Sequence, residues 1–179
     1  AASDVYKRQI LSHAAKHHRG AKIVSVDAEG AVSRSTWPAV ALGAAKLAQA
    51  LTRLGVRPGD RIAAQVEKSP EALVLYAACV QAGLVFLPLN TAYTAAEVSY
   101  FVENAQPKLI VCDPARQAEM RALADRCGVF AVVNLGQHGE GSLATIAATM
   151  DERHETAERT EDDLAGLLYT SGTTGRSKG

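Results

Sequence analysis

Residues 167–179 read Leu-Leu-Tyr-Thr-Ser-Gly-Thr-Thr-Gly-Arg-Ser-Lys-Gly, and this stretch gives the clearest indication of the chemistry of the chain. The segment combines hydroxyl side chains, two spaced glycines and a lysine: Ser171, Gly172, Thr173, Thr174, Gly175 and Lys178. Glycines allow a loop to adopt positive φ and to bring backbone N–H groups close to an anion. Hydroxyl and ammonium groups supply further hydrogen-bond donors for phosphate oxygens. The composition therefore predicts a loop that binds a polyphosphate.

The residues before this loop, Leu164 to Tyr169, form a short apolar run that predicts a buried strand. The loop is not a Walker A loop, because Lys178 lies three residues after Gly175 and is followed by Gly179, where Walker A requires a hydroxyl residue. A polar surface loop without a ligand is the alternative interpretation, because Ser, Thr and Gly cluster in many loops.

Composition narrows the class of protein. A chain of 179 residues with 47% hydrophobic residues can bury a substantial core and is expected to form one domain. Nineteen basic and nineteen acidic residues cancel, so the chain lacks the basic footprint of a nucleic-acid-binding protein. Cys79, Cys112 and Cys127 show no C-x-x-C spacing, which predicts buried reduced thiols and a cytoplasmic location. The sequence shows neither an apolar run of about 18–20 residues, as a membrane helix needs, nor a secretory signal.

Hydrophobic periodicity predicts alternating helices and strands. A hairpin is expected first, with strands over 22–27 and 31–35. Further strands are expected over 61–66, 84–89, 108–112, 129–135 and 164–169. Helices are expected over 10–19, 37–55, 69–83, from Thr94 through 102, 114–127 and 142–150, with a charged connector over 151–163. This alternation predicts an α/β fold with a mainly parallel sheet flanked by helices.

The string Tyr-Thr-Ser-Gly-Thr-Thr-Gly-x-x-Lys-Gly after an apolar strand resembles the phosphate-loop signature of the adenylate-forming superfamily, which includes acyl-CoA synthetases, amino-acid-adenylating domains and luciferases. Two weaker stretches, Gly55–Ile62 and Gly83–Asn90, the second followed by Glu97 and Tyr100, extend the resemblance over about residues 20–179. It implies that residues 10–179 are the N-terminal portion of the AMP-binding large domain, ending just after the phosphate loop. Residues 1–9 do not resemble the start of such enzymes and are expected to be a non-native or disordered leader.

The resemblance also implies a reaction. The family uses ATP to activate a carboxylate as an acyl-adenylate, after which a thiol such as that of coenzyme A displaces AMP. A small carboxylate, ATP, Mg²⁺ and coenzyme A are therefore the expected partners and cofactors. The implied contacts to the ATP phosphates come from Thr170, Ser171, Gly172, Thr173, Thr174, Gly175 and Lys178. Lys178 is the implied catalytic residue, and Thr170 lies near the implied Mg²⁺ position.

The wording of three stretches, Gln65–Ser69, Phe86–Thr94 and Thr173–Lys178, is most similar to malonyl-CoA synthetases. Ser177 stands where many acyl-CoA synthetases have proline, which costs the loop some rigidity but keeps the position of the lysine. Two other functions stay open: an amino-acid-adenylating domain that loads a carrier protein, and a non-catalytic α/β nucleotide-binding domain.

Two other clusters suggest metal sites at first sight. His13 and His17 lie four residues apart and would share a helix face, and an acidic run extends from Glu158 to Asp163. No third ligand accompanies the histidines, and the acidic run lies among charges of both signs. Both clusters are therefore expected to be solvated surface.

Overall fold

The computed structural model describes residues 12–26 and 30–169. Within them, four parallel strands form a sheet in the order β4-β3-β5-β6, namely β3 (Arg61–Gln65), β4 (Val85–Pro88), β5 (Leu109–Cys112) and β6 (Ala131–Asn134). The helices are a short one over residues 12–17, α2 (Trp37–Arg53), α3 (Pro70–Gln81), α4 (Ala95–Ala105), α5 (Gln117–Cys127) and α6 (Ser142–Ala148). The prediction of a parallel α/β sheet flanked by helices is confirmed.

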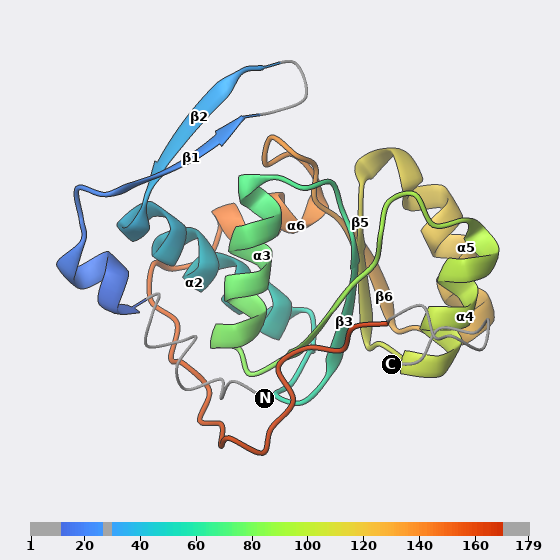
Figure 1. Cartoon of the computed structure of the whole chain (residues 1–179). Coiled ribbons are helices and arrows are strands. Elements are labelled where there is room, and N and C mark those ends of the chain that lie inside the picture. Colours follow the sequence, from blue (N-terminus) through green and yellow to red (C-terminus); the bar gives the residue numbers. More distant parts are fainter. Residues whose placement is uncertain (1–11, 27–29, 170–179) are drawn as a thin grey trace.

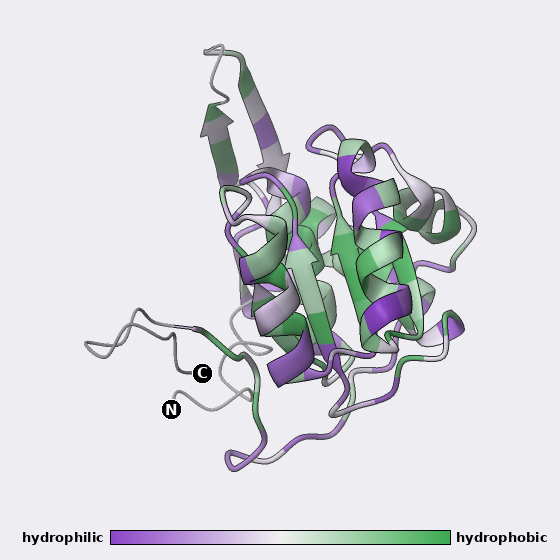
Figure 2. Ribbon diagram, turned by 90° about the vertical axis from the view of Figure 1, so that its right-hand side faces the viewer, coloured by the Kyte–Doolittle hydropathy of each residue, from purple (hydrophilic) through white to green (hydrophobic). Residues whose placement is uncertain are grey.

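The helices cover both faces of this sheet (Figure 1). On one face, α2, α3 and α6 enclose a core that contains the fully buried Leu51, Leu75 and Leu109. On the other face, α4 and α5 enclose a second core around Val98, Ile110 and Met120. Parallel strands covered on both faces need apolar residues at nearly every position. Figure 2 shows this composition as a hydrophobic sheet between helices whose outer surfaces are hydrophilic.

The helices begin where the sequence places capping residues. The side chains of Thr36 and Ser69 accept hydrogen bonds from the backbone N–H groups of Ala39 and Ala72, at the starts of α2 and α3. At the start of α4, the Thr94 hydroxyl accepts from the Glu97 N–H, and the Glu97 carboxylate accepts from the Thr94 N–H at 2.8 Å. Thr94 and Glu97 thus form a capping box, which satisfies two backbone donors at this helix end.

The predicted hairpin is also confirmed. Strands β1 (Lys22–Val26) and β2 (Val32–Thr36) pair antiparallel and form a two-stranded sheet apart from the parallel one. The hairpin projects from the body of the molecule next to the start of α2 (Figure 1). Its apolar side chains Val24, Val26 and Val32 are exposed.

One predicted helix is divided. The expected helix over 114–127 consists of a 3₁₀ turn, η1 (Pro114–Arg116), followed by α5. The Asp113 side chain accepts from the Ala115 N–H at 2.9 Å, and the Arg116 N–H bonds back to the Asp113 carbonyl at 3.0 Å. These tight turn bonds replace the first turn of an α-helix, since they link residues two and three apart instead of four.

The connector over 151–163 returns the chain to the sheet without a helix or strand. It lies along the end of α3, where the Ala157 N–H donates to the Gln81 carbonyl at 2.9 Å. The Gln49 side chain donates to the Asp151 carbonyl at 2.8 Å, which ties the connector to α2 as well. In the part of the chain that the structure describes, no helix combines the length and the apolar character needed to cross a membrane.

Candidate functional site

The predicted phosphate-binding residues, Thr170 through Lys178, lie outside the described residues. The structure describes the segment that leads into them, residues 164–169, which we call the loop stem. The stem runs parallel to β4 beside the free edge of that strand, with Gly166 opposite Phe86. The Phe86 N–H donates to the Ala165 carbonyl, and the Leu167 N–H donates to the Phe86 carbonyl, both at 3.0 Å. The stem therefore runs toward the carboxyl end of the sheet, where open α/β sheets bind ligands.

The prediction that the stem is a buried strand is wrong. Its pairing with β4 is a single bridge, and the side chains of Leu164 and Leu168 are 59% and 68% exposed. The apolar run was taken as buried because parallel strands are usually covered on both faces. Here α4 covers one face of the stem, where Leu167 and Tyr169 pack against the second core. Leu164 and Leu168 gain no such cover from the described residues.

Tyr169, the last described residue, is held by α4. Its ring packs against Phe101 with centroids 4.7 Å apart, and Phe101 in turn packs against Tyr93 at 5.0 Å. The Tyr169 hydroxyl donates a hydrogen bond to Oδ1 of Asn104 on the same helix. Burial raises the pKa of this hydroxyl above its ordinary value, which keeps it protonated and able to donate.

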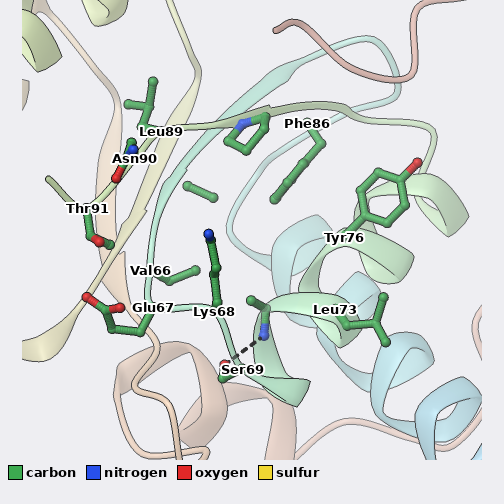
Figure 3. Close-up of a pocket in the computed structure, with 13 residues that line it drawn as sticks. Val66, Glu67, Lys68, Ser69, Leu73, Tyr76, Phe86, Leu89, Asn90 and Thr91 are labelled. Atoms are coloured by element: carbon green, nitrogen blue, oxygen red, sulfur yellow. Dashed lines mark hydrogen bonds between the residues drawn. The ribbon is translucent and has the colours of Figure 1, made fainter. Parts of the chain in front are cut away.

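A pocket of about 490 Å³ opens at the carboxyl ends of β3 and β4, on the face that carries α3. Its walls include Val66, Leu73, Tyr76, Phe86 and Pro88, and its polar groups include Glu67, Lys68, Ser69, Asn90 and Thr91. Figure 3 shows Lys68 extending between Val66 and the β4 residues, with Ser69 turned to the helix N–H that it caps. An apolar wall with a few polar groups is typical of small-molecule sites.

Neither Lys68 nor Asn90 was predicted to be a site residue. Both residues follow predicted parallel strands, and the carboxyl ends of such strands meet at one edge of a sheet. That placement is the signal that could have found the pocket.

Gln65, at the end of β3, holds the turn at Asn90. The fully buried Gln65 side chain donates to the Asn90 carbonyl at 2.8 Å. Asn90 then accepts from the Ala92 N–H at 3.0 Å, which shapes the approach to α4. Among the described residues, the other polar atom of Gln65, Oε1, has no hydrogen-bond partner. Gln65 thus holds the pocket residue Asn90 and, through it, the turn that precedes α4.

Two of the three cysteines are buried in the core. Cys79 and Cys112 are buried free thiols, as predicted, whereas Cys127 is only half-buried, so the prediction was wrong for that residue. Burial raises the pKa of the Cys79 thiol far above its ordinary value and that of Cys112 to about 11. Thiols with raised pKa values carry little thiolate and react slowly, so both act as small core residues.

The clusters considered as metal sites remain surface features. The rings of His13 and His17 lie 4.5 Å apart on the exposed side of their helix. In the acidic run, Asp163 pairs with Arg159 at 3.2 Å and accepts from the Thr160 N–H at 2.7 Å. Within residues 12–26 and 30–169, no group of three or more His, Cys, Asp or Glu side chains could hold a metal ion.

A known protein family matches almost the whole chain. The family model described as AMP-binding enzyme matches residues 11–179. Among curated proteins, the chain is 32% identical over 95% of its length to 3-methylmercaptopropionyl-CoA ligase from Ruegeria lacuscaerulensis, and 30% identical over the same share to medium-chain-fatty-acid–CoA ligase from Ectopseudomonas oleovorans. It spans 33% of the length of each of these relatives.

A solved structure shows the same likeness in three dimensions. ATP-bound MatB from Rhodopseudomonas palustris matches with a TM-score of 0.82 and 43% identity. The match covers 96% of this chain and 34% of that one. Nearly the whole chain thus has a counterpart in each of these three proteins.

Proposed function

Because the chain belongs to the AMP-binding enzyme family, we propose that it is part of an ATP-dependent acid–CoA ligase. The observation that carries this proposal is the 43% identity to ATP-bound MatB over 96% of the chain, together with relatives that are named CoA ligases. The reaction has two steps. The carboxylate attacks the α-phosphorus of ATP and releases pyrophosphate, and the thiol of coenzyme A then displaces AMP to form the thioester.

In the first step, negative charge grows on the departing pyrophosphate. Fixed donors that face this charge stabilise the transition state more than the ground state. The donors that we assign are the hydroxyl groups of Ser171, Thr173 and Thr174, the backbone of Gly172 and Gly175, and the ammonium group of Lys178. Hydroxyl, N–H and ammonium donors match phosphate oxygens, so the donor set of the loop fits a triphosphate.

Mg²⁺ is the metal that we propose, with the Thr170 hydroxyl as its contact on this chain. A hydroxyl oxygen suits a hard cation that prefers oxygen ligands and keeps phosphate oxygens and water around it. The bound ion would supply positive charge beside the phosphates.

Malonate is the acid that we propose. This choice depends on the resemblance of Gln65–Ser69 and Phe86–Thr94 to malonyl-CoA synthetases, because the named relatives act on varied acids. The first of these stretches begins at the end of β3, and the second runs from β4 to the cap of α4. Both supply walls of the pocket at the carboxyl edge. For the location we propose the cytoplasm, because the three cysteines are free thiols.

The test is Lys178→Ala in a protein that carries this chain within the full length of its relatives. We expect ATP–pyrophosphate exchange with malonate to slow by about 10²–10³-fold, because one charge-assisted contact to the transition state is lost. Arg176→Ala is the matched control, since it removes a cation two residues away, and it should exchange at close to the unaltered rate. Exchange at the unaltered rate in Lys178→Ala would contradict the assigned role.

The choice of acid is tested in the same assay with a panel. Malonate should support exchange better than medium-chain fatty acids or amino acids. Exchange driven by an amino acid would favour the carrier-loading alternative. Nucleotide binding without exchange for any acid would favour a non-catalytic domain.

A further inference from the structure

The backbone pairing that holds the loop stem ends before the loop begins. The Phe86 backbone makes both stem hydrogen bonds, to the Ala165 carbonyl and from the Leu167 N–H. In a parallel ladder, the next donor from β4 toward the stem would be the N–H of residue 88, which would bond the Leu167 carbonyl. Residue 88 is proline and has no N–H. The ladder therefore lacks the backbone hydrogen bond from residue 88, which would otherwise hold the stem close to its last residue.

Beyond this missing bond, the side chain of Tyr169 holds the stem against α4. Its ring lies 4.7 Å from the ring of Phe101 at an interplanar angle of 45°, and Phe101 is itself buried against the sheet. Its hydroxyl donates to Asn104, one turn further along α4. The two contacts fix both the position and the direction of the side chain one residue before Thr170.

The helix that makes these contacts is firmly placed. Val98, Phe101 and Val102 of α4 are buried in the second core, and the capping box closes its first turn. Tyr93, in the turn held by Gln65 and Asn90, also packs against the Phe101 ring, with centroids 5.0 Å apart. A residue anchored on such an element can transmit a fixed position to the chain that follows.

We propose that Tyr169 is a positioning residue for adenylation, which fixes the end of the loop stem on α4 through Phe101 and Asn104, one residue before the phosphate-binding sequence begins. This role rests on the proposed function, because it concerns the same loop. The ring contact contributes more than the hydrogen bond, because Phe101 is buried whereas Asn104 is exposed. Tyr169 touches no reacting atom and acts through the residues that follow it.

The test compares Tyr169→Ala, Tyr169→Phe and the neighbouring Leu168→Ala in a protein of the relatives' full length. We expect Tyr169→Ala to lower kcat/KM for ATP by about 10- to 100-fold, because small misplacements of a binding group are costly. Tyr169→Phe keeps the ring and should lose only about two- to fivefold, as for one exposed hydrogen bond. Leu168→Ala alters an exposed side chain and should match the unaltered protein. The KM for the acid should be unchanged in all three.

Hydrogen exchange supplies a readout that does not depend on turnover. Tyr169→Ala should speed exchange at the Leu167 amide while the α4 amides keep their protection. If that loosening occurs, ATP kinetics are unchanged and Lys178→Ala still slows adenylation, the positioning role is wrong and the proposed function stands. If Lys178→Ala is also without effect, the role assigned to the phosphate loop is wrong, and this inference fails with it. If no acid supports exchange in the unaltered protein, the proposed function itself fails. Faster exchange throughout α4 with equal rises in both KM values would mean general destabilisation and would overturn the inference.

Discussion

Replacement of Gly83 by alanine will destabilise the fold more than the same replacement at Gly128. Both glycines follow the end of a helix and have positive φ, +67° and +70°. Alanine in this left-handed region costs about 1–2 kcal/mol at either position. The surroundings differ, because a β-carbon at Gly83 would lie 3.0 Å from Cβ of Ala157 and 3.0 Å from Cδ of Arg159. At Gly128, no described atom from a more distant part of the chain lies within 4 Å of that position.

The difference in surroundings sets the size of the effect. Overpacking a filled contact costs about 1–3 kcal/mol, and Gly83→Ala should exceed Gly128→Ala by about that amount. Arg159 can move its flexible side chain aside. Ala157 has less freedom, because its β-carbon is attached to a backbone whose N–H bonds the Gln81 carbonyl. Relief of the contact therefore requires displacement of the connector from the end of α3.

Urea unfolding of the two variants measures this difference in the free energy of unfolding. A third protein, Gly83→Ala with Ala157→Gly, removes the stiffer half of the contact and should recover part of the loss beyond the sum of the single changes. Equal losses for Gly83→Ala and Gly128→Ala would show that the connector does not press on Gly83, and the packing argument would be wrong.

Two further predictions concern the core and the cap of α4. Leu51→Ala will lower the free energy of unfolding by about 2–5 kcal/mol because Leu51 is fully buried, whereas Leu164→Ala on the exposed side of the stem will change it by no more than about 0.5 kcal/mol; urea unfolding measures both. The hydrogen bonds from the hydroxyl and N–H of Thr94 hold the pKa of the Glu97 carboxyl below its ordinary value. The stability that they add is present above about pH 4.3 and is lost as the pH falls through the lower folded pKa. Glu97→Gln, which cannot titrate, should lose less stability between pH 5.5 and pH 3, as measured by urea unfolding at each pH, and an identical decline would contradict the capping contribution.

Most helices and strands could be predicted from the sequence, because the patterns that mark them involve residues close together along the chain. Caps at Thr36, Ser69 and Thr94 act within one helical turn, and apolar runs mark strands that are covered on both faces. The helix predicted over 114–127 was divided because the Asp113 side chain competes with the helical pattern. That competition is also local, yet periodicity does not record it.

The candidate site also has a part that could be predicted from the sequence and a part that could not. The donor set of the loop, Thr170 through Lys178, is a matter of residue type and spacing, so it could be proposed from the sequence, and its geometry lies outside the described residues. The pocket around Lys68 and Asn90 joins the ends of two strands more than twenty residues apart, and no local pattern marks it.

Residue order and composition were thus enough to specify an α/β fold, most element bounds and a family of phosphate-binding chemistry, because each depends on neighbours along the chain. Sheet order, the exposed side of the stem and the contact of Tyr169 with Asn104, 65 residues away, needed the folded molecule. They depend on which surfaces pack together in the folded chain. Whether a strand is covered is decided by the elements that pack against it and not by its own residues.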